Sequence, residues 1–179
     1  MFKFIKHDLY RYSSSIKLKS FIKNYFLSPG FNYIFWFRLS SKYKNPIFKY
    51  LLFRKMIKYG IEIHTGTNIG KGFYIGHWGG IVINSKAVIG ENGNISQGVT
   101  IGIINSGLKQ GVPTIGNRVY IAPGAKIIGN IKIGNDVAID ANAVVINDVP
   151  DGVTVGGIPA KVISQNDSSE YINRIWNDK

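Results

Sequence analysis

The stretch PTIGNRVYIAPGAKIIGNIKIGNDVAIDANAVV, residues 113–145, carries isoleucine or valine at every sixth position. An α-helix repeats its apolar residues every three or four positions, so this spacing excludes a helix. A fixed short period predicts a solenoid, and a period of six predicts a β-helix. The same period reaches back to Ile63 and gives thirteen inward-facing positions: Ile63, Ile69, Ile75, Ile83, Ile89, Ile95, Ile101, Ile115, Ile121, Ile127, Ile133, Ile139 and Val145.

These positions predict a mainly β fold over residues 61–163. Three hexapeptides close one triangular coil of about 18 residues, so thirteen positions predict four to five coils. The period breaks twice. Two extra residues follow Ile75, and about eight extra residues follow Ile101. We expect the second break to form an extruded loop over residues 103–112, because loops on a rigid scaffold often carry function.

The first 60 residues form a separate, basic and aromatic segment. They hold thirteen Lys and Arg against one acid, Asp8, whereas the rest of the chain is balanced, and the formal net charge is +12. We expect one or two short helices over residues 1–28, broken near Ser13–Ser15, and further helices over residues 31–44 and 46–59, with Gly60 as the C-cap of the last. An anionic membrane surface and plain solvation of a helical cap both explain the charge, and we do not expect nucleic acid as a partner. Residues 164–179 predict a helical tail, capped by Asp167 or Ser168.

The N-terminus lacks the features of a secretory signal, and no apolar stretch of about 18 residues is present. We therefore expect a cytoplasmic protein, in peripheral contact with the inner membrane face if the basic segment binds lipid. The chain has no cysteine, so it forms no disulfide and offers no thiolate to a metal.

The segments GHWGGIVIN (76–84), NISQGVTIG (94–102), PGAKIIGNIKIG (123–134) and GGIPAKVI (156–163) occur in the order typical of one family. Together with the repeats, they make the chain resemble the hexapeptide-repeat acyltransferases, in their serine acetyltransferase-like branch. Within that branch it looks most like the O-acetyltransferases of capsule, O-antigen and exopolysaccharide synthesis. The resemblance implies a left-handed parallel β-helix, a homotrimer with active sites between subunits, and acetyl-CoA as donor. It implies no metal in the chemistry.

The resemblance also implies roles for single residues. Acetyl transfer to a hydroxyl needs a general base, and histidine suits that task at neutral pH. His77 lies in the first break and matches the family's catalytic histidine. Glu62, fifteen residues earlier, matches an orienting carboxylate, although the family has aspartate there. His64 matches a histidine that we expect to be structural.

Other positions match the donor site. Gly102, Ala122 and Pro123 correspond to the pantetheine channel, although Pro123 has no N–H to donate. The exit turn, with Gly157, Ile158, Pro159, Ala160 and Lys161, corresponds to the nucleotide end of the coenzyme, where Lys161 supplies the positive charge.

The acceptor site departs from that of serine acetyltransferases. Gly76 replaces an aspartate before the histidine, and Gly111-Val112 replace an Arg-His pair that reads the carboxylate of the amino acid. Trp78 offers an aromatic face, and Asn105, Lys109 and Gln110 of the loop are candidate acceptor contacts. We therefore expect acetylation of a sugar or lipid-linked glycan hydroxyl in surface polysaccharide synthesis. The alternatives are serine O-acetylation for cysteine synthesis and a scaffold without catalysis.

Overall fold

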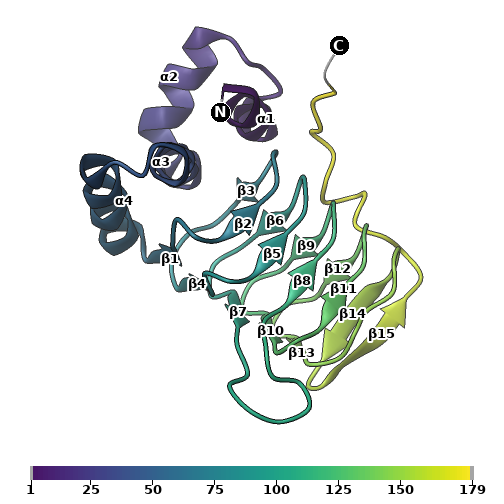
Figure 1. The fold of residues 1–179 in the computed structure, drawn as a ribbon. Helices are drawn as coiled ribbons and strands as arrows, with labels where there is room; N and C mark the ends of the chain where they lie inside the picture. The colour runs from purple at the N-terminus through teal and green to yellow at the C-terminus, as the bar shows by residue number, and fades with distance from the viewer. Residues whose placement is uncertain (1, 178–179) are drawn as a thin grey trace.

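The computed structural model describes residues 2–177 and consists of a helical cap, a parallel β-solenoid and an extended tail (Figure 1). The cap holds four helices: α1 Phe2–Ser13, α2 Leu18–Leu27, α3 Pro29–Tyr43 and α4 Pro46–Tyr59. Gly60 ends α4 in the left-handed conformation, and its N–H donates to the Met56 carbonyl, which confirms the predicted C-cap. No helix within residues 2–177 is long and apolar enough to cross a membrane.

The solenoid is built from three sheets that form the sides of a triangular prism, and every strand pairing is parallel except that of the last strand. The five-stranded sheet contains β1 Ile61–Ile63, β4 Ile81–Ile83, β7 Thr100–Gly102, β10 Lys126–Ile128 and β13 Val144–Val145. The four-stranded sheet contains β2 Asn68–Ile69, β5 Val88–Ile89, β8 Thr114–Ile115 and β11 Lys132–Ile133. The six-stranded sheet contains β3 Tyr74–Ile75, β6 Asn94–Ile95, β9 Tyr120–Ile121, β12 Ala138–Ile139, β14 Thr154–Gly157 and β15 Ala160–Ser164. The predicted parallel solenoid of about five coils is therefore confirmed.

The period-six residues form the core of the prism. All thirteen are buried, and they stack in register from coil to coil, as in Ile63 against Ile83 and Ile83 against Ile101. Each coil therefore covers the apolar side of its neighbour, which is why a six-residue repeat needs several copies to fold.

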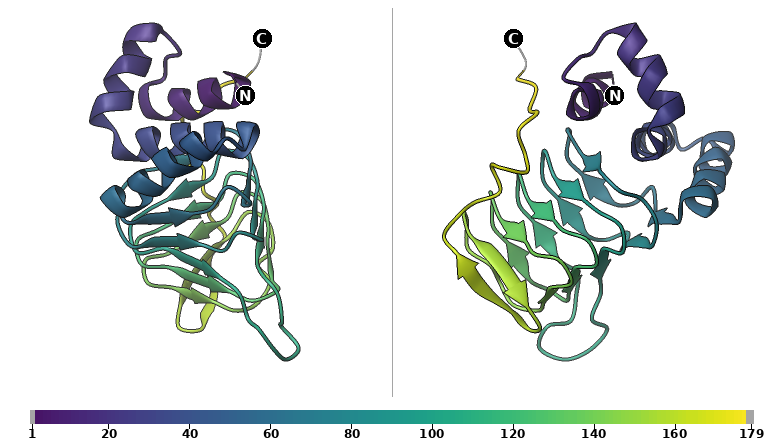
Figure 2. Two further views of the ribbon diagram at one scale, coloured as in Figure 1. Left: turned by 60° about the vertical axis from the view of Figure 1, so that its left-hand side comes forward. Right: turned by 180° about the vertical axis from the view of Figure 1, so that it is seen from behind.

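The helical cap covers the first coil (Figure 2), and side chains of the cap form hydrogen bonds with the open edge of that coil. Tyr33 donates its hydroxyl hydrogen to the Ile63 carbonyl at 2.8 Å and accepts the Ile63 N–H at 3.1 Å. Tyr12 does the same for Ile75, at 3.3 and 2.9 Å. An open strand edge is a site for aggregation, so these hydroxyls take the place of a missing coil.

Arg38 completes the pairing at the second strand of that coil. Its guanidinium donates to the carbonyls of Ile69 and Gly70, both at 2.6 Å, and to the buried Asp8 carboxylate. Asp8 in turn accepts the Phe73 N–H at 2.9 Å. Tyr33, Arg38 and Tyr12 of the cap thus each form hydrogen bonds with a different strand of the first coil: β1, β2 and β3, respectively.

The predicted C-terminal helix is wrong. Residues 165–177 form an extended strap across the outer face of the six-stranded sheet and reach α1 (Figure 1). Asp167 does accept the Ser169 N–H, and Ser168 accepts the Ile172 N–H, but only one turn forms. A short helix is marginal in water, and contacts with the sheet prevail here: Tyr171 stacks on Tyr120 with ring centroids 4.0 Å apart.

Candidate active site

Apart from Glu62 on β1, the predicted site residues lie along two edges of the prism. The histidine edge consists of the corners that lead from the six-stranded to the five-stranded sheet, at residues 76–80, 96–99, 122–125 and 140–143. The loop edge consists of the corners that lead from the five-stranded to the four-stranded sheet, including residues 103–113. Because the strands are parallel, these two edges lie at opposite ends of the five-stranded sheet.

His77 lies exposed at the first corner of the histidine edge. The corner bulges because it contains two more residues than a regular step. Gly79 and Gly80 have φ angles of 103° and 63°, which favour glycine, and the Gly79 carbonyl accepts the Gly98 N–H of the next coil at 2.9 Å. The coil below therefore supports the bulge that presents His77 to solvent.

Glu62 projects outward from β1, where it is paired with Val82 of β4. Within residues 2–177 its carboxylate bonds to His64, with 3.3 Å between Oε1 and Nε2, and no hydrogen bond joins it to His77. Both side chains are about half exposed and line a surface hollow of about 470 Å³ between β1 and α4. The role of Glu62 as the orienting partner of His77 stays a prediction.

From the sequence we expected His64 to be structural and did not predict its pairing with Glu62. The spacing of the two residues could have indicated the pair, because residues two apart in a strand point to the same face. His64 therefore joins Glu62 and His77 among the candidates for proton transfer.

Trp78 lies beside a hollow of about 120 Å³ that the helical cap helps to form. Tyr74 and Gly76 line it from the solenoid, and Tyr12 and the turn at residues 27–30 line it from the cap. Burial raises the pKa of the Tyr12 hydroxyl well above its usual range, so this wall is neutral. Trp78 itself is 49% exposed and can offer its ring face to an acceptor.

Ala122 and Pro123 follow two coils below His77 on the histidine edge. The Ala122 N–H donates to the Ile139 carbonyl at 2.9 Å, and Pro123 has no N–H. Neither residue therefore offers a backbone donor to an acetyl carbonyl, although their small side chains leave the edge open to a long ligand.

The exit turn continues the same edge at the far end. β14 and β15 form an antiparallel hairpin, with Gly157 opposite Ala160 and Gly156 opposite Lys161. Ile158 is 75% exposed and Lys161 is exposed. Four strand-to-strand steps separate β3 from β14, which corresponds to about 19 Å. His77 and Lys161 thus lie toward opposite ends of one long edge.

Gly102 and the extruded loop lie on the loop edge. Ile104 and Gly111 close the loop with two backbone hydrogen bonds of 3.0 and 2.9 Å. The Lys109 ammonium bonds to the Ile146 carbonyl and the Asn147 side chain, so it is held by its own solenoid.

Asn105 and Gln110 are exposed on the loop, which projects away from the body of the prism (Figure 1). A three-residue strand spans about 10 Å, so a single protomer does not bring the loop to His77. These acceptor contacts stay predictions that require a second copy of the chain.

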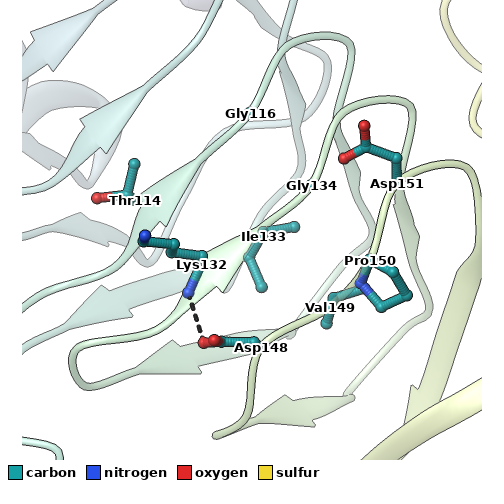
Figure 3. Close-up of a pocket in the computed structure, with 9 residues that line it drawn as sticks. All are labelled: Thr114, Gly116, Lys132, Ile133, Gly134, Asp148, Val149, Pro150 and Asp151. Carbon is teal, nitrogen blue, oxygen red and sulfur yellow. Dashed lines mark hydrogen bonds between the residues drawn. The ribbon is translucent and has the colours of Figure 1, made fainter.

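A hollow of about 540 Å³ lies elsewhere, at the end of β8 and β11 (Figure 3). Lys132 and Asp148 line it, and the Lys132 N–H donates to the Asp148 carboxylate at 2.8 Å. It contains none of the residues predicted for catalysis or binding. We therefore place the candidate site on the histidine edge.

Comparison with known proteins supports the family and corrects the finer resemblance. The model of the bacterial transferase hexapeptide (six repeats) matches residues 113–147. A serine acetyltransferase of Helicobacter pylori is 39% identical over 145 residues, which cover 78% of this chain and 84% of that protein. One from Staphylococcus aureus is 49% identical over 60% of this chain, which spans half the length of that protein. These relatives are named serine acetyltransferases and not polysaccharide O-acetyltransferases.

Solved structures give the same result. Serine acetyltransferase of Neisseria gonorrhoeae in complex with serine matches with a TM-score of 0.76 and 32% identity, over 90% of this chain and 68% of that one. Serine acetyltransferase of Brucella abortus in complex with coenzyme A matches with a TM-score of 0.75 and 29% identity, over 90% and 66%. The chain therefore belongs to the hexapeptide-repeat transferase family, among relatives that are named serine acetyltransferases.

Proposed function

We propose that the chain transfers an acetyl group from acetyl-CoA to the hydroxyl of serine, with His77 as general base. As a member of this family it is an acetyl-CoA-dependent acyltransferase. The names of its relatives support serine as acceptor. The observation that carries the mechanism is the exposed His77 on a corner held by the coil below.

His77 takes the proton from the acceptor hydroxyl as its oxygen attacks the thioester carbonyl. The C–S bond then breaks, and the protonated imidazole returns the proton to the departing thiolate, so the reaction needs no further reactant. The donor extends along the histidine edge toward Lys161, whose ammonium suits its phosphates. The chain has no cysteine, so no thiol accepts the acetyl group in between.

The loop contacts of this proposal depend on a homotrimer. His77 and the extruded loop lie on different edges of one protomer. Rotational symmetry brings the loop edge of one protomer toward the histidine edge of the next and creates three equal sites.

A second candidate acceptor is a carbohydrate hydroxyl. Gly76, Gly111 and Val112 stand where serine acetyltransferases carry the charged groups that bind an amino acid. The hollow beside Trp78 is lined by tyrosine, serine and apolar residues, which suit a neutral acceptor. This local evidence favours a sugar, whereas the comparisons favour serine.

Thiol release from acetyl-CoA tests both acceptors. Wild type and His77→Ala are assayed with L-serine, nucleotide sugars and short glycans, and Lys132→Ala, at an exposed position of β11, is the control. We expect His77→Ala to lower kcat by about 10²–10⁴-fold and the control to change nothing. Release with sugar but not serine selects the second candidate, and activity retained by His77→Ala rejects the site.

Glu62→Gln and His64→Ala form a second pair in the same assay. If Glu62 orients His77, Glu62→Gln lowers kcat by at least about tenfold, or 1.4 kcal/mol of barrier, and His64→Ala does not. If kcat falls equally in both variants, the Glu62 carboxylate acts through its pair with His64 and does not orient His77.

A further inference from the structure

The helical cap presents a surface that is positive and carries no carboxylate. Asp8 is the only acid among residues 1–60. It is buried beneath the surface, where it accepts hydrogen bonds from Arg38 at 2.9 and 3.1 Å. The exposed part of the cap over residues 2–60 therefore offers lysine and arginine with no acid to offset them.

Helix α4 points an apolar stripe into solvent. Ile47, Tyr50, Phe53 and Ile57 are 64%, 56%, 53% and 67% exposed. Their spacing of three, three and four residues puts them on one helix face. On the opposite face Leu52 is buried. A helix on the surface of a globular protein normally turns its polar side outward, whereas α4 also exposes these four apolar side chains.

Basic side chains border this α4 stripe. Lys49, Arg54 and Lys58 are exposed on the same helix, and α4 contains no acid. Helices that lie in a membrane interface combine an apolar face with a lysine- and arginine-rich border.

Helix α2 repeats the pattern. Leu18, Ile22 and Phe26 stand at every fourth position and are 74%, 50% and 75% exposed, and Lys19 and Lys23 are exposed beside them. Helices α2 and α4 both pack on α3. The cap lies at the end of the solenoid opposite to β14 and β15 (Figure 2). Both stripes thus lie away from the exit turn, and the α4 stripe borders, through Phe53 and Ile57, the hollow that Glu62 and His64 line.

Charge decides which occupant fits these stripes. A second copy of the cap would bring a like charge against this one, with no exposed carboxylate to pair with the lysines. A nucleic acid would match the charge but would leave the apolar side chains without a partner. An anionic lipid surface satisfies both, because its headgroups attract the basic residues and its acyl region accepts the apolar ones.

We propose that the helical cap docks peripherally on an anionic lipid surface through the stripes of α4 and α2. The solenoid then projects away from the surface, and the histidine edge stays open to its substrates. This inference is independent of the acceptor and of catalysis by His77.

Co-sedimentation with vesicles tests the proposal. The full chain is mixed with phosphatidylcholine vesicles that contain or lack phosphatidylserine. We expect binding only with phosphatidylserine, and loss of binding near about 1 M salt, where the screening length falls to about 3 Å. Absence of binding to phosphatidylserine vesicles at low salt overturns the proposal.

Variants separate the two parts of the surface. Arg54→Glu/Lys58→Glu is expected to weaken binding at least about 25-fold, because each basic residue at such a surface contributes about fivefold. Lys86→Glu/Lys132→Glu on the solenoid removes the same charge from exposed positions and is expected to bind as wild type. Equal loss in both double variants would mean that only net charge matters, and would overturn docking through the cap.

Phe53→Ser/Ile57→Ser tests the apolar stripe. Both side chains are exposed, so the variant is expected to fold, and vesicle binding is expected to weaken at least about tenfold. Sedimentation velocity without lipid is run in parallel. If wild type associates with concentration through its caps and this variant does not, the stripes serve a second copy and the proposal fails.

Discussion

At the start of the solenoid, single side chains of the cap make hydrogen bonds that a further coil would otherwise make, and Arg38 is one of them. Its guanidinium donates hydrogen bonds to the carbonyls of Ile69 and Gly70 and to the buried Asp8 carboxylate. Arg38→Met leaves that charge buried without its partner, so we expect the free energy of unfolding to fall by about 3–5 kcal/mol. Arg54→Met, on an exposed position, is expected to change it by less than about 0.5 kcal/mol. Urea unfolding of both variants checks this; equal values would mean that Arg38 contributes no edge pairing.

A tyrosine hydroxyl at the same edge predicts a pH dependence of stability. Burial raises the pKa of Tyr33 above its usual value near 10. The folded state therefore keeps a proton that the unfolded state loses, and stability falls as the pH rises above about 10. We expect Tyr33→Phe to flatten this fall in urea titrations between about pH 8 and pH 11. Tyr43→Phe, half exposed on the same helix, is expected to keep the wild-type slope; a matching slope in Tyr33→Phe contradicts the prediction.

At the scale of elements, the C-terminal strap ties the two ends of the solenoid together. Tyr171 stacks on Tyr120 of β9, its carbonyl accepts from Asn94 of β6, and Trp176 packs on His7 of α1 with ring centroids 5.0 Å apart. A chain that ends at residue 164 uncovers the outer face of this sheet. We expect hydrogen exchange in β6 and β9 to accelerate and the thermal midpoint to fall. Glu170→Ala, an exposed change within the strap, is the control, and unchanged exchange in the shortened chain would show that the strap adds no stability.

At the scale of the whole molecule, the two edges predict that inactive variants complement each other. His77→Ala damages only the histidine edge, and replacement of residues 105–110 by glycine and serine damages only the loop edge. If each site joins two protomers of a trimer, we expect a mixture unfolded and refolded together to recover about a quarter of wild-type activity, because a quarter of the sites draw both parts from undamaged edges. Each variant refolded alone is the control. A mixture as inactive as its components would place the complete site within one protomer.

The sequence by itself determined the solenoid, its core and the positions of its two breaks. Because an apolar residue stands at every sixth position, a coil built from hexapeptides buries all of these residues. All thirteen are buried, as predicted. The helix break after Ser13 and the end of α4 at Tyr59, with Gly60 as its C-cap, also followed from local signals. Such features depend on neighbours in the chain, which a sequence shows directly.

Only the tertiary structure decided which side chains from different parts of the chain contact one another. Glu62 bonds to His64, Lys109 to Ile146 and Arg38 to Ile69, and the tail is a strap in place of a helix, because Tyr171 finds Tyr120. The division of the site between two edges likewise follows from parallel strands that begin and end at opposite sides of a sheet. These contacts join residues from different coils and elements, and their energies compete with local preferences that a periodic pattern cannot rank.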